Sequence, residues 1–347
     1  MRYIALSTAY LCLMLIAPMT LTYSAEPASG FKVTKKIEVG GEGGWDYLAM
    51  DSEARRLYVS HATKVLVIDV DKGEVVGEVS NTNGVHGIAI APELGRGFTS
   101  NGRDATVTIF DLKTLKPIGS AKTGGNPDAI LYDHVTKRVF TFNRMRADAT
   151  STVIDAATGE VAGTITLGGR PEFAVSDGKG KIFVNLDDKN EIGVIDSNKL
   201  AVIQRWPLAP GTEPSGLAID IKKHRLFSVC GNQKMIIMNA DDGKVIAAVP
   251  IGKGTDAAAF DPGTGLVFSS NGEGTLTVVK ETSPNNYSVV ENAVTQQGAR
   301  TMALDLKTHK VYLSTAQYGP PPPPTTDRPN PRPAVVPGTF MILEMSR

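Results

Sequence analysis

Seven residues, most of them charged, recur at one place in seven similar segments of the chain, roughly 42 residues apart. They are Asp46, His86, Asp128, Glu172, Ser215, Asp256 and Arg300. If the segments stand around a common axis, these side chains form a ring at one end of a central channel. Like charges repel, so clustered carboxylates must hold a proton, bind a cation or pair with basic side chains.

The order around the ring draws attention to Asp128 and Glu172, which are neighbours. No cation of the ring stands beside Glu172, and oxygen ligands suit hard cations such as Ca²⁺ or Mg²⁺. Asp128 and Glu172 are therefore candidate metal ligands, although no cofactor is certain. His86 and Glu172 are candidate catalytic residues, because a histidine can act as acid and base near neutral pH.

Internal salt bridges are the competing interpretation. Arg300 falls between Asp256 and Asp46, so both acids have a basic partner within the ring. Loops beside the ring offer further arginines: Arg103, Arg144, Arg146 and Arg170. A ligand held at the channel mouth would contact Asp46, His86, Asp128, Glu172, Asp256 and Arg300.

Other polar residues lie near the same end of the channel: His61, Asn101, Asn143 and Asn271. Turn capping explains the asparagines as well as ligand contact does. Trp45 directly precedes the ring position and is a candidate wall of the channel mouth. The other histidines, expected to be solvated, fall in turns at the opposite end: His134, His224 and His309.

The segments that position the ring form seven copies of a repeat. An aromatic residue marks the second strand of each copy: Tyr58, Phe98, Phe140, Phe183, Phe227, Phe268 and Tyr312. A short apolar strand precedes it and two more strands follow, which is the pattern of a propeller blade. An aspartate fills the turn before it in six copies, and Ala91 replaces it in the second. The sequence predicts an all-β, seven-bladed propeller of four-stranded antiparallel blades.

The last copy contains only three of the four strands. Residues 31–39 (FKVTKKIEV) resemble a fourth strand with no copy in front of them. We expect this segment to supply the outer strand of blade seven, because that pairing closes the ring and removes two exposed sheet edges.

These segments resemble the YVTN-type β-propeller repeat over nearly the whole chain after residue 30. The resemblance is carried by NPDAILYD, RPEFAVSD, EPSGLAID, RLYVS, VFSSN, VLVID and IGVID. It implies the architecture and leaves function open, since such propellers include surface-layer, periplasmic and lactonase-like members.

Blade seven departs from the pattern in a proline-rich loop over residues 318–338, with five consecutive prolines at 320–324. It is either a tolerated surface insertion, or a lid or partner-docking arm at the channel mouth.

Residues 1–25 have the pattern of a secretory signal peptide, with Arg2, an apolar run to Met19 and small residues at Ser24 and Ala25. A retained N-terminal anchor is the alternative. Cleavage would remove Cys12, leave Cys230 as a buried lone cysteine, and place one propeller domain, residues 26–347, in the periplasm or outside the cell.

No sequence motif names a reaction. CxxCH, HExxH, Walker and GxSxG patterns are absent, and 36 basic residues balance 36 acidic ones, which gives no case for nucleic acid. The chain is therefore predicted to be a monomeric exported binding or scaffold protein for a protein, peptide or small ligand, with no membrane span after signal removal. The alternatives are a lactonase- or lyase-like enzyme with a metal- or histidine-assisted site in the channel, and a subunit that supports a redox partner.

Overall fold

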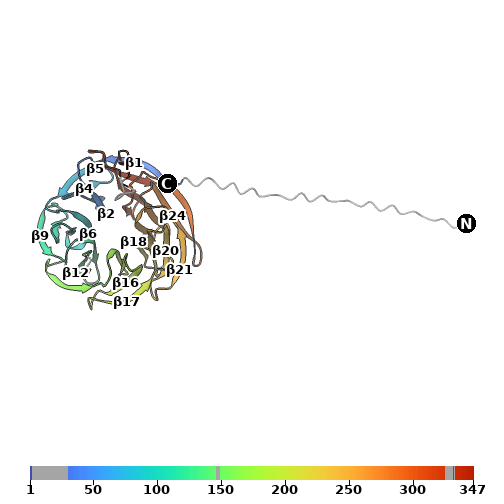
Figure 1. Ribbon diagram of the computed structural model, residues 1–347, viewed down its shortest axis with the longest axis horizontal. Coiled ribbons are helices and arrows are strands. Elements are labelled where there is room, and N and C mark those ends of the chain that lie inside the picture. The colour runs from blue at the N-terminus through green and yellow to red at the C-terminus, as the bar shows by residue number, and fades with distance from the viewer. Residues whose placement is uncertain (2–29, 146–148, 325–330, 332) are drawn as a thin grey trace.

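The computed structural model describes residue 1 and residues 30–145, 149–324, 331 and 333–347. Within these ranges the chain forms seven four-stranded antiparallel sheets arranged in a ring (Figure 1). The predicted seven-bladed propeller is confirmed. Residues 2–25 of the proposed signal peptide and Arg146 lie outside the described residues.

The strands repeat in the same order from the channel to the rim. The inner strands are β2 (Trp45–Asp51), β6 (Val85–Ala91), β10 (Pro127–Asp133), β14 (Pro171–Ser176), β18 (Pro214–Asp220), β22 (Thr255–Asp261) and β26 (Met302–Asp305). The second strands are β3 (Arg56–His61), β7 (Arg96–Asn101), β11 (Arg138–Asn143), β15 (Lys181–Leu186), β19 (Arg225–Cys230), β23 (Leu266–Asn271) and β27 (Lys310–Thr315). The third strands are β4 (Lys64–Asp69), β8 (Thr106–Asp111), β12 (Thr150–Asp155), β16 (Glu191–Asp196), β20 (Lys234–Asn239), β24 (Thr275–Ser283) and β28 (Met341–Ser346). The outer strands are β5 (Glu74–Val79), β9 (Pro117–Lys122), β13 (Val161–Thr166), β17 (Ala201–Pro207), β21 (Val245–Pro250), β25 (Asn286–Val294) and β1 (Lys32–Glu38).

Ring closure follows the prediction. Strand β1 pairs with β28 from Lys32 opposite Ser346 to Glu38 opposite Met341, so the N-terminal strand completes the last blade. In Figure 1 the blue β1 lies beside the red C-terminal strands. Ile37 is buried in the core, which anchors β1 by side-chain packing as well as by backbone hydrogen bonds.

The core lies between neighbouring blades. The repeated aromatic residues are at most 1% exposed. They pack across blade boundaries: Tyr58 meets Phe110 with ring centroids 6.0 Å apart, and Phe227 meets Phe260 at 5.6 Å. A large flat side chain at this position therefore contributes to the contact that holds adjacent blades together.

The turn aspartates are structural. Asp220 Oδ1 accepts hydrogen bonds from the backbone N–H groups of Lys222 and Lys223, and Asp51 and Asp305 accept equivalent bonds. In blade two, where Ala91 replaces the aspartate, the turn is a short 3₁₀ helix, η1 (Pro92–Leu94). These aspartates therefore cap backbone N–H groups of the turns.

The base of the proline-rich loop is folded back on itself. Tyr318 and Val335 form an isolated antiparallel bridge, Gly319 N donates to Ala334 O at 2.8 Å, and Val336 N donates to Gln317 O at 2.8 Å. The described parts of the loop therefore form a hairpin-like extension next to β28.

Candidate functional site

The ring residues occupy one structural position. In β2, β6, β10, β14, β18 and β22 the ring residue is the second residue of the strand, and Arg300 lies two residues before β26. The pairing register with the second strand shifts at this point in all six strands, as between Trp45 and Leu48. A β-bulge bends the strand and redirects a side chain, so these bulges explain why the ring residues leave the regular sheet.

At the bulges, serine hydroxyls accept hydrogen bonds from backbone N–H groups of the inner strands. Ser60 Oγ accepts a hydrogen bond from the Asp46 N–H at 2.9 Å, and Ser100 Oγ accepts one from Gly87 at 2.8 Å. Ser100 also donates to the carbonyl of Asp128 in the next blade. These bonds hold the ring residues of adjacent blades at a fixed spacing.

Asp46, His86 and Asp128 form the first cluster of the ring. His86 Nδ1 lies 2.7 Å from Asp46 Oδ2 and 3.5 Å from Asp128 Oδ1. Burial lowers the pKa of His86, but the hydrogen bond with Asp46 and the charge of Asp128 outweigh it and raise the pKa above its usual value. The structure thus brings together three of the predicted site residues.

Arg144 is the centre of the second cluster. Its Nη1 donates to Asp128 Oδ2 at 2.8 Å, and its Nη2 contacts Glu172 and lies 3.3 Å from Asp187 Oδ2. Arg170 Nε donates to Asp187 Oδ1 at 2.7 Å. Three carboxylates therefore share two arginines. Arg144 lies between Asp128 and Glu172, the two residues predicted as metal ligands, so the geometry here favours internal salt bridges.

One carboxyl group of the second cluster favours its protonated form. Burial raises the pKa of Glu172 to about 9; Arg144 opposes this shift, and the negative charges of Asp128 and Asp187 add to it. The cluster described above has three carboxylates and two arginines, so a proton on Glu172 removes the negative charge that no arginine balances.

Asp187 was missed by the sequence analysis, although a signal was present. Arg144 and Asp187 are the residues that directly follow β11 and β15. The other five second strands are followed only by glycine or alanine: Ala62, Gly102, Gly231, Gly272 and Ala316. At this position of the repeat, two charged residues stand where the other five copies have glycine or alanine, which indicates side chains that reach toward the channel.

The remaining ring residues form a third group. Arg300 donates through Nη1 to Asp256 Oδ2, and Ser215 Oγ donates to Asp256 Oδ1 at 2.7 Å. Burial raises the pKa of Asp256, while the charge of Arg300 and the Ser215 bond oppose that rise. Of the two acids beside Arg300 in the ring, only Asp256 forms an ion pair with it within the described residues.

Two aromatic side chains, each directly following a residue of the charged ring in sequence, pack against each other across the channel. Tyr47 of β2 and Phe173 of β14, which belong to blades one and four, have ring centroids 5.5 Å apart. Both pack against a hydrophobic cluster that includes Ala129 and Ala174. The charged residues thus line the end of a channel that aromatic side chains narrow.

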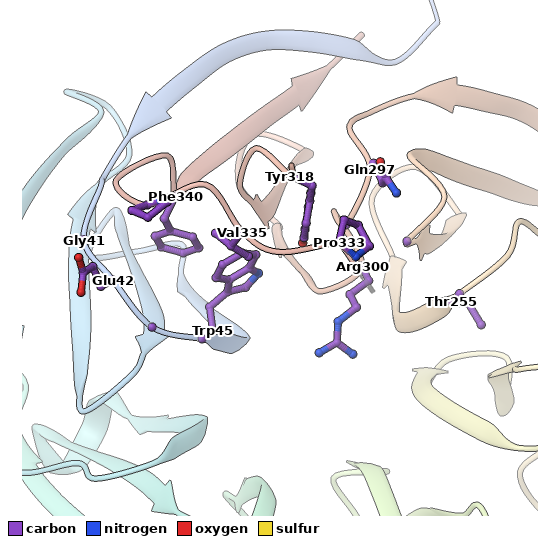
Figure 2. A pocket seen from close by; sticks show the side chains of 16 residues that line it. Gly41, Glu42, Trp45, Thr255, Gln297, Arg300, Tyr318, Pro333, Val335 and Phe340 are labelled. Atoms are coloured by element: carbon purple, nitrogen blue, oxygen red, sulfur yellow. The ribbon is translucent and has the colours of Figure 1, made fainter. Parts of the chain in front are cut away.

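A pocket of about 930 Å³ opens beside the ring, under the base of the proline-rich loop. Trp45, Tyr318 and Phe340 supply aromatic walls, and Arg300 supplies a cation (Figure 2). In Figure 2 the side chain of Arg300 extends downward, so that its guanidinium points away from Pro333. The loop therefore contributes to the walls of a pocket at the channel mouth.

A second pocket of about 440 Å³ adjoins the first and shares Trp45 and Arg300 with it. Asp46, His86 and Arg103 also line it. The first charged cluster is therefore reachable from the aromatic pocket.

The polar residues that end the second strands are structural. Asn101 accepts a hydrogen bond from Thr99 at 2.8 Å and donates to Thr108 at 2.8 Å, and Asn143 and Asn271 repeat this pattern with their own hydroxyl neighbours. They are bound within the sheet, rather than to turns as the capping interpretation supposed.

His61 occupies the same position in blade one but has different surroundings. Val59 and Leu66 replace the hydroxyl residues there. The imidazole instead stacks on Phe340 with centroids 4.6 Å apart, and Phe340 in turn packs on Trp45 at 4.8 Å. His61 thus supports the aromatic wall from behind.

The other singled-out residues lie away from the pockets at the channel mouth. Cys230 is buried, and burial raises the pKa of its thiol to about 12. His309 Nδ1 lies 2.8 Å from Asp261, and His224 Nδ1 lies 2.8 Å from Asp241. The sequence predicted solvated histidines at these two positions, but each of them pairs with an aspartate of a turn.

Comparisons with known proteins bear on the fold. The chain resembles a structure of hydrazine synthase from Kuenenia stuttgartiensis with a TM-score of 0.70 at 17% identity, covering 78% of this chain and 92% of that one. No family model and no curated protein matches the chain. Among the residues that the structure describes, no helix is long and apolar enough to cross a membrane.

Proposed function

We propose that this protein is a binding protein that holds a small anionic ligand with an aromatic or other apolar body in the pocket at the channel mouth. The observation that carries the proposal is the composition of that pocket, in which Trp45, Tyr318 and Phe340 surround a space that Arg300 also lines. Its volume of about 930 Å³ fits a small organic molecule. Aromatic walls bind flat apolar groups, and an arginine binds a carboxylate or phosphate.

Tryptophan fluorescence provides a direct test, because the chain has two tryptophans and they differ in place. Trp45 lines the pocket, whereas Trp206 is buried between blades four and five. In a Trp206→Phe variant, titration with phenylacetate, 4-hydroxybenzoate and indole-3-acetate should change the Trp45 emission with saturation. Absence of any saturable change up to millimolar concentrations would count against the proposal.

The role of Arg300 is tested in the same assay. An Arg300→Gln substitution should weaken binding about tenfold or more, because a charge-assisted hydrogen bond is lost. Arg225→Gln is the matched control, since Arg225 lies at the start of β19 in the turn region and lines neither of these pockets. Equal affinities in the two variants would show that Arg300 does not hold the ligand.

An enzymatic function is the second candidate, favoured by the hydrogen-bonded pair of His86 and Asp46 on the wall of the second pocket. A carboxylate that orients a histidine is an arrangement used in acid–base catalysis. Turnover of a panel of lactones, abolished by His86→Ala without loss of the fold, would support it. Unchanged turnover in that variant would exclude His86 from the reaction.

We also infer that the protein is exported and is a YVTN-type propeller that acts as a monomer. The pattern of residues 1–25 supports export, and the repeat segments support the kinship. The intact mass of the protein purified from its native cell tests export, because cleavage after Ser24 or Ala25 would shorten it. A mass that retains residues 1–25 would favour the anchor. Support of a redox partner stays a prediction.

A further inference from the structure

Only one of the two carboxylate oxygens of Asp128 accepts a hydrogen bond among the described residues. It is 4% exposed, and its Oδ2 receives the hydrogen bond from Arg144. Its Oδ1 is buried and has no hydrogen-bond partner among the residues that the structure describes. Leaving a buried carboxylate oxygen unpaired is costly, so a native structure that keeps one calls for a partner at that place.

The unpaired oxygen points into a group of possible metal ligands. One ligand atom from each of Asp46, His86 and Asp128 lies within 4.8 Å of the others. His86 Nδ1 is 2.7 Å from Asp46 Oδ2 and 3.5 Å from Asp128 Oδ1. Ligands bound to zinc at about 2.0–2.2 Å stand about 3.0–3.5 Å apart. The distance of 3.5 Å between His86 and Asp128 fits this spacing, whereas His86 and Asp46, at 2.7 Å, would have to move apart to admit the ion.

The donor set selects the class of cation. One imidazole nitrogen and two carboxylate oxygens suit Zn²⁺, Mn²⁺ or Fe²⁺, whereas Ca²⁺ requires six to eight oxygen ligands. This group shares Asp128 with the predicted pair of Asp128 and Glu172, but it has Asp46 and His86 in place of Glu172 and favours a different class of cation.

Neighbouring groups hold the three ligands in place. Arg144 fixes the Asp128 carboxylate through Oδ2 and leaves Oδ1 available. Ser60 holds the backbone of Asp46. Arg144 Nη2 also lies 3.3 Å from Asp187 Oδ2, so its positive charge is shared and opposes a cation less than an isolated arginine would.

The cluster is accessible from solvent. Asp46 and His86 line the pocket of about 440 Å³, and their side chains are 19% and 33% exposed. An ion could therefore enter from the channel mouth and keep coordination positions open toward the pocket.

We propose that Asp46, His86 and Asp128 form a binding site for a divalent transition-metal cation, with Zn²⁺ as the best match, and that its open positions face the pocket. The inference is independent of the aromatic-pocket proposal, because the metal is measured without any organic ligand. The competing arrangement is a protonated His86 that bridges the two aspartates without a metal.

Calorimetric titration of the chelator-treated, tag-free protein with ZnCl₂ tests the site. One equivalent should bind, and Asp128→Asn and His86→Gln should each weaken the affinity about 100-fold or more. His309→Gln is the matched control, because His309 forms the same kind of pair with Asp261 but has no third ligand within the described part of the chain. It should bind zinc like the wild type.

Two further measurements keep the outcome clear. Asp46→Asn changes a partly exposed side chain and serves if a buried variant fails to fold, as judged by circular dichroism. The visible spectrum of the Co²⁺-loaded protein reports the ligands directly and should be lost in the same variants. Wild-type protein that binds no stoichiometric zinc, or binds it as tightly as His86→Gln does, would overturn the proposal.

Discussion

Tyr47 and Phe173 lie in blades one and four, yet their rings meet with centroids 5.5 Å apart. Most side-chain contacts in a propeller join neighbouring blades, so a contact between two distant inner strands narrows the channel. A ligand that enters from the charged mouth would meet this pair as a floor.

Truncating Tyr47 should destabilise the whole ring. Tyr47→Ala is expected to lower the free energy of unfolding by about 2–4 kcal/mol, because it leaves a cavity against Phe173. Tyr47→Phe keeps the aromatic side chain and should lower the free energy of unfolding by less than about 1 kcal/mol. Urea denaturation measures both. If the two variants lose the same small amount, the aromatic contact contributes little.

Stability should depend on pH through Glu172. Its pKa is about 9 in the folded protein and 4.5 in an ordinary setting. Between these values the unfolded chain releases a proton that the folded chain keeps, so the free energy of unfolding falls as pH rises, by at most about 1.4 kcal/mol per pH unit. Glu172→Gln should flatten this slope and be more stable than the wild type at pH 8.

Denaturation curves at pH 5, 6.5 and 8 check the prediction for Glu172. Glu78→Gln, which changes an exposed carboxylate on β5, is the control and should keep the wild-type slope. A Glu172→Gln variant that loses equal stability at all three values would show that Arg144 requires an ionised partner there.

The blades and the positions of the ring residues were predictable from the sequence because each is encoded locally. An aromatic residue every roughly 42 positions marks a buried second strand, and apolar segments before it mark inner strands. The ring register followed from aligning the repeats. The segment 31–39 was recognisable as a strand, since the C-terminal copy lacks the fourth strand of its blade.

The contacts within the site were less predictable because they depend on three-dimensional detail. The bulges that redirect Asp46 and its counterparts have no simple residue signature. Asp187 follows the second strand of blade four and pairs with Arg144 and Arg170, so Glu172 has to share Arg144 with it. The aromatic wall combines Trp45 with Tyr318, which the chain separates by most of its length.

The closing strand should be essential for stability. Deleting residues 31–39 removes the partner of β28 and leaves the edge of β28 exposed, so the melting temperature should fall sharply. A milder version is Ile37→Ala, which should cost about 2–4 kcal/mol because Ile37 is buried, while Lys36→Ala on the exposed side should cost little. A truncated protein with an unchanged melting temperature would contradict the closure.

Cys230 should be unreactive in the native protein. Its side chain is buried, and burial raises its pKa to about 12, so almost no thiolate exists at pH 8. In a Cys12→Ser variant, Ellman's reagent should find no thiol in the native protein and one thiol after unfolding in guanidinium chloride. Ser120→Cys places a thiol on the exposed strand β9 and should react at once. Rapid labelling of the native Cys12→Ser protein would show that blade five opens far more readily than its packing implies.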